Sequence, residues 1–326
     1  MDYTALGRTG LRVSRICLGT MNFAWQIGEQ ESHAILDRAL GAGVNFVDTA
    51  NMYGSRDGDG MSEQFIGSWF ANSGARDKIV LATKVYAPMS DWPNDGGLSA
   101  RHIIASCEAS LRRLRTDWID LFQMHHIQRE TPWEEIWQAM ETLTVQGKIR
   151  YAGSSNFAGW HLARAQAAAD ARHYLGLVSE QAKYNLLTRH VELEVLPSAR
   201  ALGIGILAYS PLHFGALSGA LRKQRDQQGV RTLMHAPERV EPHRAALERY
   251  EKLCAGLGLA PATVALAWLL SRPGVTAPVI GPRTPEQLDV PLEALTTRLG
   301  DEVLRELDAI FPPIGAGGPG PEAWAW

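Results

Sequence analysis

The feature that most constrains the fold is a regular alternation of short apolar runs with longer amphipathic segments along almost the whole chain. Continuous apolar runs, rich in β-branched or aromatic residues, are typical of parallel strands buried on both faces. Most of the intervening helical segments open on a Ser, Thr or Pro that favours a helix start. The strand-like runs occupy residues 15–19, 44–48, 79–84, 119–125, 150–155, 176–181, 205–210 and 277–281.

Eight strand–helix units, spaced by about 25 to 40 residues, predict a (β/α)8 TIM barrel that forms one domain. An open doubly wound sheet is the alternative, but it usually carries a glycine-rich turn after an early strand, and no GxGxxG follows one here. We expect residues 1–14 to cap the barrel and residues 312–326 to form a C-terminal tail. The wide gap between the seventh and eighth runs predicts a long loop and an extra helical segment.

The composition limits the class of protein. The chain has 326 residues, is 45% hydrophobic and carries a net charge of -3, which suits a soluble globular protein with a large core. The balance of 32 basic and 35 acidic residues indicates neither a nucleic-acid nor a membrane-binding face. No signal-like or membrane-spanning apolar stretch is present, so we expect a cytoplasmic location. Cys17, Cys107 and Cys254 are odd in number and far apart, which predicts free thiols.

Four polar residues stand at or just beyond the ends of three successive strand-like runs: Asp48, Tyr53, Lys84 and His125. In a closed parallel barrel the carboxyl ends of the strands meet at one mouth, so these side chains should converge there. Taken singly, each has a more ordinary structural interpretation, as a solvated lysine, a turn aromatic or a satisfied histidine. Together they predict a site that handles protons. The adjacent His126 should point the opposite way, because side chains alternate along a strand, and no metal site is expected.

These residues fall within strings that resemble the aldo-keto reductase superfamily, in order and over nearly the whole chain: GTMNF, FVDTANMYG, LATK, IDLFQMHH, GSSNF, SEQAKYN, AYSPL and VIGPRTPEQL. The resemblance implies that the four polar residues are catalytic and that the cofactor is a nicotinamide dinucleotide. The strings QMHHIQRETPWEEIWQAM, SRPGVTAPVIGPRTPEQLD and PEAWAW are most similar to bacterial reductases of nucleotide-activated deoxysugars. That similarity implies an NDP-4-keto-6-deoxyhexose, reduced at a 3-keto group or a 2,3-enoyl bond in antibiotic deoxysugar biosynthesis.

Carbonyl reduction requires a proton donor as well as a hydride. A phenol has a pKa of about 10, roughly 3 units above neutrality, which corresponds to about 4 kcal/mol. An ammonium about 4 Å away supplies an interaction of that order at an effective dielectric of about 20. We therefore expect Tyr53 to give the proton, Lys84 to lower its pKa, Asp48 to hold Lys84, and His125 to orient the carbonyl.

The ends of the later runs offer groups for a nicotinamide. Ser155, Asn156 and Gln181 suit a carboxamide, which both donates and accepts, and the ring of Tyr209 could stack on the nicotinamide. The resemblance adds further cofactor contacts, with Arg283 favouring NADPH through a bidentate pairing with its 2′-phosphate. These contacts are Gly19, Thr20, Met21 and Asp48 near the nicotinamide, Ser210, Leu212, Gly215, Leu217, Ser218 and Gly219 at the pyrophosphate, and Gly281, Arg283, Thr284 and Gln287 at the adenosine phosphate.

Several points stay open at this level. Val290 and Pro291 replace the Glu-Asn usual in the family, so the adenine contacts are in doubt. The basic stretch 222–231 is either a solvated loop or a flap over a phosphate, and Trp324 and Trp326 should dock on another surface. A broad aldehyde or ketone reductase and a cofactor-binding regulatory subunit are the alternative functions. The oligomeric state is not predicted.

Overall fold

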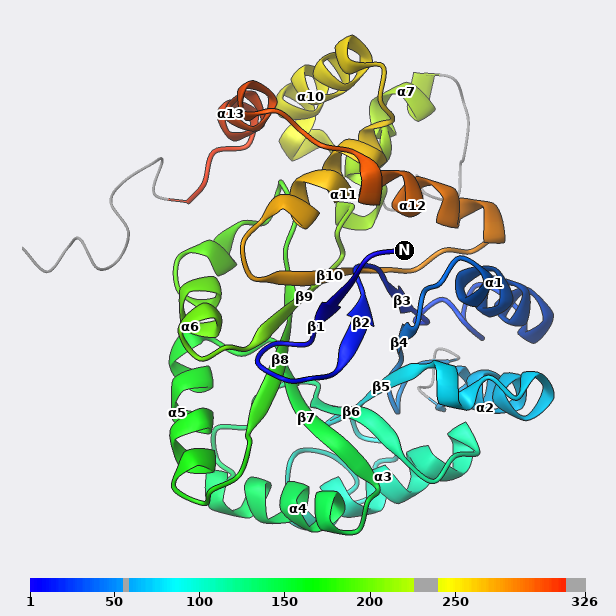
Figure 1. Ribbon diagram of the computed structural model, residues 1–326, viewed down its shortest axis with the longest axis vertical. Coiled ribbons are helices and arrows are strands. Elements are labelled where there is room, and N and C mark those ends of the chain that lie inside the picture. Colours follow the sequence, from blue (N-terminus) through cyan, green and yellow to red (C-terminus); the bar gives the residue numbers. More distant parts are fainter. Residues whose placement is uncertain (55–58, 226–239, 315–326) are drawn as a thin grey trace, which may run out of the picture.

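The computed structural model describes residues 1–54, 59–225 and 240–314. Eight parallel strands close into a barrel in the order β10-β3-β4-β5-β6-β7-β8-β9, which confirms the predicted (β/α)8 fold (Figure 1). Each predicted run overlaps one of these strands, which are β3 (Cys17–Gly19), β4 (Phe46–Asp48), β5 (Val80–Val85), β6 (Ile119–Met124), β7 (Ile149–Ser155), β8 (Leu177–Lys183), β9 (Gly205–Tyr209) and β10 (Val275–Ile280). The C-terminal tail from residue 315 onward and most of the basic stretch 222–231 lie outside the described residues.

Helices surround the barrel (Figure 1). Helix α3 shows how the sequence sets their limits: Ser99 Oγ accepts from the backbone N–H of His102 at 3.2 Å, and Arg115 ends the helix with a φ of 50°. The described helices are α1 (Glu29–Gly41), α2 (Met61–Ser73), α3 (Ala100–Leu114), α4 (Trp133–Val145), α5 (Gly159–Asp170), α6 (Val195–Ala201), α7 (Ala220–Arg225), α10 (Arg244–Leu257), α11 (Pro261–Ser271), α12 (Asp289–Thr296) and α13 (Asp301–Ile310), with 3-10 turns η1 (Arg76–Lys78), η2 (His190–Glu192), η3 (His213–Ser218), η4 (Glu241–His243) and η5 (Pro285–Leu288).

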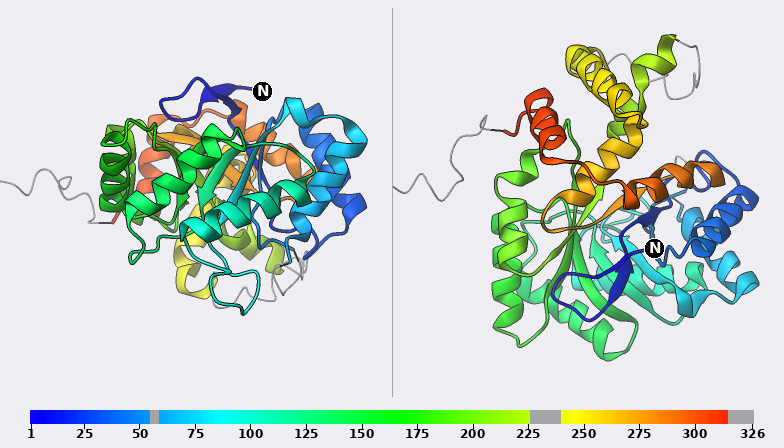
Figure 2. Two further views of the ribbon diagram at one scale, coloured as in Figure 1. Left: turned by 90° about the horizontal axis from the view of Figure 1, so that it is seen from below. Right: turned by 45° about the horizontal axis from the view of Figure 1, so that its top comes forward.

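An N-terminal hairpin, which the sequence reasoning did not resolve into strands, lies across one end of the barrel (Figures 1 and 2). It pairs β1 (Tyr3–Ala5) with β2 (Arg12–Ser14) in antiparallel fashion. Its fully buried Leu6 and Val13 join an apolar cluster that includes Phe46 and Leu121 from the barrel strands. The hairpin turns at Gly7, where φ is +56° and a Cβ would lie 2.4 Å from the Val178 carbonyl oxygen. The hairpin therefore closes the amino-terminal end of the barrel.

The segment between β9 and β10 contains η3, α7, η4, α10 and α11, which confirms the extra helical segment predicted for this insertion. Helix α11 begins at Pro261, whose fixed φ suits the first helical turn. In the described ranges no single helix is long and apolar enough to cross a membrane. The pair Glu241–Leu257 and Pro261–Ser271 reaches that length and composition only with a bend of 93° between its parts.

The strand register gathers polar side chains into one layer inside the barrel. Asp48 pairs with Ala82, Lys84 with Gln123, and Ser155 with Gln181 across neighbouring strands. Because side chains alternate along a strand, a residue two positions beyond an inward apolar one also points inward. The polar layer therefore lies directly above the apolar cluster, at the carboxyl ends of the strands.

Candidate active site

Lys84 and Asp48 form the buried centre of the polar layer. The Lys84 ammonium donates to Asp48 Oδ2 at 2.6 Å, to the Thr49 carbonyl at 2.8 Å and to Tyr53 Oη at 3.4 Å. Lys84 is 0% and Asp48 2% exposed. Burial alone would lower the pKa of Lys84, but the Asp48 carboxylate and the Tyr53 phenol outweigh it and raise this pKa above its usual value. The three hydrogens of a charged ammonium thus have three acceptors.

Tyr53 lies above this pair, with its ring centroid 5.9 Å from that of His125 and the planes at 78°. Burial raises the pKa of its phenol, Lys84 lowers it and Asp48 raises it again, so that the pKa is above the ordinary value. Lys84 thus lowers this pKa as expected, but desolvation of the phenolate is the larger effect and leaves the pKa raised. Tyr53 therefore keeps its proton at neutral pH.

His125 directly follows β6 and is held by a hydrogen bond from its backbone N–H to the Val85 carbonyl, at 2.9 Å. Burial, with smaller contributions from Lys84 and His126, lowers the pKa of its imidazole to about 3. The ring is therefore neutral at physiological pH and can donate one N–H to an oxygen. His126 is exposed and its ring contacts that of Tyr86, at 5.6 Å between centroids. Within the described ranges, no three His, Cys, Asp or Glu residues are grouped as metal ligands.

Two glutamines complete the surroundings of Asp48. Gln123 and Gln181 each donate from Nε2 to Asp48 Oδ1 at 2.9 Å, and both side chains are buried. The sequence reasoning assigned Gln181 to the cofactor and missed Gln123. A signal was available, because Gln123 lies two positions before His125 and is the one polar residue of β6 after Asp120.

Asn156 follows β7 in the left-handed region, with a φ of 62°. Its Nδ2 donates to the His125 carbonyl at 3.2 Å and to Ser155 Oγ at 3.0 Å, while its Oδ1 accepts from Tyr209 Oη at 2.8 Å. The amide predicted to meet a carboxamide is thus engaged within the protein and joins the loops after β6 and β7 to the end of β9. Among the described residues no donor reaches Gln181 Oε1, so that atom is the acceptor left for a ligand.

Glu180, which the sequence reasoning also missed, supports this loop from below. Its fully buried carboxyl group accepts from the Phe157 backbone N–H at 3.0 Å and lies 2.5 Å from Ser154 Oγ. Burial raises its pKa to about 8, although these hydrogen bonds act in the opposite direction. Glu180 thus holds the residues on both sides of Ser155 and Asn156, through the Ser154 side chain and the Phe157 backbone.

The predicted cofactor residues at the end of β3 and just after it have different roles in the structure: some hold neighbouring strands or residues in place, and one is exposed on the surface. The backbone N–H and Oγ1 of Thr20 donate to the Asp48 carbonyl at 3.0 and 3.1 Å, so Thr20 fixes Asp48. A Cβ on Gly19 would lie 2.8 Å from a methyl group of Val279, which shows how closely β3 and β10 approach. Met21 is 49% exposed.

The predicted pyrophosphate segment follows β9 with an irregular backbone. Phe214 and Gly215 have φ values of 54° and 96° inside η3, and Gly219 ends it at 82°. Ser218 Oγ accepts from Lys223 Nζ at 3.0 Å. Among the other predicted residues of this segment, Leu217 is buried, while Ser210 and Leu212 are half-buried.

The predicted phosphate end lies on the loop after β10. Arg283 is half-buried, and its backbone N–H donates to Gln287 Oε1 at 2.8 Å. Burial and the neighbouring guanidinium groups of Arg222 and Arg283 lower the pKa of Lys223. Cationic groups from α7 and from the loop after β10 therefore share one region, which fits a phosphate. The predicted residues Gly281, Thr284 and Gln287 on this loop are all exposed.

The two positions that depart from the family pattern lie in the first turn of α12. Val290 packs against the main apolar core, and Pro291 is buried. Both side chains thus contribute to packing on this helix.

Large apolar side chains surround the carboxyl ends of the strands. They are exposed by 38 to 78% and lie on the loops that follow β3, β4, β5 and β9. These residues are Met21, Trp25, Met52, Trp92 and Phe214.

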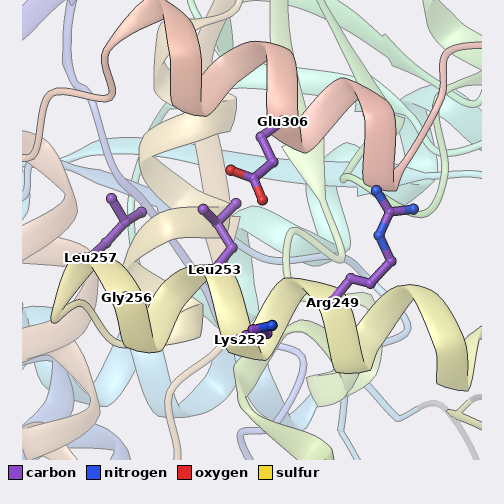
Figure 3. A pocket seen from close by; sticks show the side chains of 6 residues that line it. All are labelled: Arg249, Lys252, Leu253, Gly256, Leu257 and Glu306. Carbon is purple, nitrogen blue, oxygen red and sulfur yellow. The ribbon is translucent and has the colours of Figure 1, made fainter.

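A surface groove of about 340 Å³ lies between α10 and α13, apart from the polar layer (Figure 3). Figure 3 shows Leu253 and Leu257 on α10 facing Glu306 on α13. No residue of the Asp48–Lys84 centre lines this groove.

Comparison with known proteins agrees with this geometry. The model of the Aldo/keto reductase family matches residues 15–311. The chain belongs to this family. It is 54% identical to the uncharacterized oxidoreductase YrpG of Bacillus subtilis (strain 168) over all of both chains. It is 32% identical to the versiconal hemiacetal acetate reductase of Aspergillus parasiticus over 96% of this chain and 98% of the relative, and 33% identical to the protein tas of Escherichia coli (strain K12) over 95% and 97%.

This aldo/keto reductase is therefore an oxidoreductase that acts on carbonyl or alcohol groups. The family generally uses NAD(P)H and small-molecule carbonyl substrates.

Proposed function

We propose that this aldo/keto reductase is an NADPH-dependent carbonyl reductase in which Tyr53 is the general acid. The observation that supports this role most strongly is the Lys84–Asp48 pair, buried at 2.6 Å, with the ammonium 3.4 Å from Tyr53 Oη. A nicotinamide dinucleotide, when bound, supplies the hydride to the carbonyl carbon. The proton for the carbonyl oxygen is held at Tyr53 Oη, since the pKa of this phenol lies above its usual value.

The charges around Tyr53 support proton release at the moment it is needed. As negative charge develops on the carbonyl oxygen, the phenol gives up its proton and the ammonium of Lys84 stabilises the phenolate that remains. Asp48 keeps Lys84 charged and in place. His125 is neutral and donates its N–H to the same oxygen, which orients the carbonyl.

The side chains also fit the two ends of the cofactor. Gln181 Oε1 and Ser155 Oγ are available to a carboxamide, and Arg283 with Lys223 supplies positive charge for a 2′-phosphate.

We predict that Arg283→Ala raises the KM for NADPH about tenfold, or ~1.4 kcal/mol, and changes the KM for NADH less than about twofold. Steady-state kinetics with both cofactors measures this, with the exposed Arg305→Ala on α13 as the matched control. Equal effects on the KM values of both cofactors would contradict a contact between Arg283 and the 2′-phosphate of NADPH.

Two substrate classes follow from different observations. The exposed apolar residues around the barrel mouth favour a carbonyl compound with an aromatic or apolar body. The resemblance of three sequence strings to deoxysugar reductases favours a nucleotide-activated keto-deoxyhexose instead. We consider the first class better supported, because it rests on residues at the site itself.

The test is a panel of carbonyl compounds with NADPH, followed by loss of cofactor absorbance. Aromatic aldehydes and ketones, aliphatic aldehydes and keto-deoxysugar nucleotides should be compared at equal enzyme concentration. We expect the highest kcat/KM with the aromatic compounds. A preference for the sugar nucleotides would reverse the choice of substrate. NADPH binding without turnover of any compound would favour the regulatory subunit and contradict the proposed function.

A further inference from the structure

The contacts of Asp48 divide between its two oxygens. Oδ2 accepts from Lys84 at 2.6 Å, whereas Oδ1 accepts from the amide nitrogens of Gln123 and Gln181, each at 2.9 Å. A carboxylate can only accept, so both amides must present their nitrogen to it, and their orientation is fixed by chemistry. Gln181 Nε2 also lies 3.5 Å from Gln123 Oε1.

Gln123 is fully buried, and among the described residues its side-chain amide contacts only Asp48 and Gln181, so no other partner explains a polar residue at this depth. A carboxylate without water is stable in its charged form only when its lone pairs are satisfied. Lys84 satisfies one oxygen, and the two amides satisfy the other. Since Gln181 donates into this cluster, its Oε1 has a fixed orientation and is left to accept from a ligand.

We propose that Gln123 is a positioning residue of this reductase, which holds Asp48 and Gln181 together and so joins the proton-donating centre to the nicotinamide site. This inference rests on the proposed function and extends it. Without the Gln123 amide, Asp48 loses one of two donors on Oδ1, and Gln181 loses the neighbour beside its own amide. Lys84 then no longer has a carboxylate in a fixed position to hold its ammonium. The contact to the carboxamide likewise loses the fixed orientation of the Gln181 amide.

The first test compares Gln123→Leu with Gln166→Leu. Gln166 is a matched control, because it is also buried and donates to an aspartate, Asp170 Oδ1, at 2.7 Å, but on the outer helix α5. We expect Gln123→Leu to lower kcat by about 10- to 100-fold and to weaken NADPH binding, measured by fluorescence, by about 3- to 10-fold. Gln166→Leu should change neither by more than about twofold, while thermal unfolding reports the stability of both variants.

A second variant, Gln123→Glu, separates positioning from packing. Burial beside Asp48 raises the pKa of the introduced carboxyl, so at low pH it is neutral and its O–H can donate to Asp48 Oδ1 as the amide does. At higher pH it becomes a second negative charge. We expect kcat close to the unmodified value at low pH and a new loss as the pH rises, which a merely space-filling residue would not produce.

A Gln123→Leu variant with unchanged kcat and unchanged NADPH binding would overturn the inference and leave the proposed function intact. Absence of turnover in the unmodified protein would instead contradict the proposed function. The fluorescence titration would then decide the inference alone: weaker NADPH binding in Gln123→Leu than in Gln166→Leu supports it, and equal binding refutes it.

Discussion

The two ends of the barrel use the same strands for opposite purposes. At the amino-terminal end, the inward residues Phe46 and Leu121 pack with the hairpin residue Leu6 in an apolar cluster. Two positions further along β4 and β6, the inward residues are Asp48 and Gln123, equally buried but polar. Two residues along the same strand thus separate an apolar layer that stabilises the fold from a polar layer that contains the candidate catalytic residues.

The difference shows how a polar layer can exist at full burial. The apolar end gains free energy from every side chain separately, by about 25 cal/mol per Å² of apolar surface removed from water. The polar end is stable only as a connected set, because each buried donor or acceptor without a partner costs about 1–3 kcal/mol. Changes at the two ends should therefore have different consequences.

The largest expected effect is on activity at the polar end. Tyr53→Phe should lower kcat by about 100- to 10,000-fold, the usual contribution of a positioned proton donor. The free energy of unfolding should change by less than about 1.5 kcal/mol, since among the described residues the phenol makes only one long hydrogen bond, to Lys84 at 3.4 Å. Stopped-flow reduction and NADPH fluorescence quenching test this, and quenching should be retained. Turnover close to that of the unmodified protein would show that Tyr53 is not the general acid.

Lys84→Met should disturb both stability and activity. It leaves the Asp48 carboxylate buried without its cation, which typically costs about 3–5 kcal/mol of unfolding free energy. The double variant Lys84→Met with Asp48→Asn removes the unpaired charge and should recover part of this stability but none of the activity. Urea unfolding of the two variants gives the comparison. Equal stability of the single and double variants would contradict the ion-pair argument.

A cavity at the apolar end should affect stability alone. Leu121→Ala removes a fully buried side chain below Gln123 and should cost about 2–5 kcal/mol. kcat per folded molecule should stay within about twofold, since the residues of the polar layer keep their partners. Chemical denaturation and active-site-normalised kinetics measure the two quantities. A parallel loss of kcat would show that the layers are not separable.

The last prediction concerns the pH dependence of stability, which depends on Glu180. Its folded pKa of about 8 lies above the ordinary 4.5, so the folded state binds one proton more than the unfolded state between these values. Stability associated with this group is full below pH 4.5 and is lost as the pH rises to about 8, by at most ~1.4 kcal/mol per pH unit. Glu180→Gln should flatten the stability profile in this range. An unchanged slope would show that Glu180 is ionised in the fold.

Much of this molecule could be predicted from local sequence patterns. Apolar runs such as IVLATK and IDLFQMH identify buried parallel strands by themselves, and the convergence of Asp48, Lys84 and His125 follows once such strands close into a barrel. The N-terminal hairpin was harder to recognise, because β1 and β2 are only three residues each and their stability comes from packing on the barrel.

The sequence by itself determined the barrel and the positions of its catalytic candidates, since strand periodicity and the residue at a strand end are local properties. Only the tertiary structure decided how these groups act on one another. Gln123 and Gln181 meet Asp48 across separations of 75 and 133 residues, and Asn156 uses its amide within the protein. The pKa of Tyr53 is raised because burial outweighs Lys84, and such a balance depends on desolvation and distances that exist only after the strands have closed.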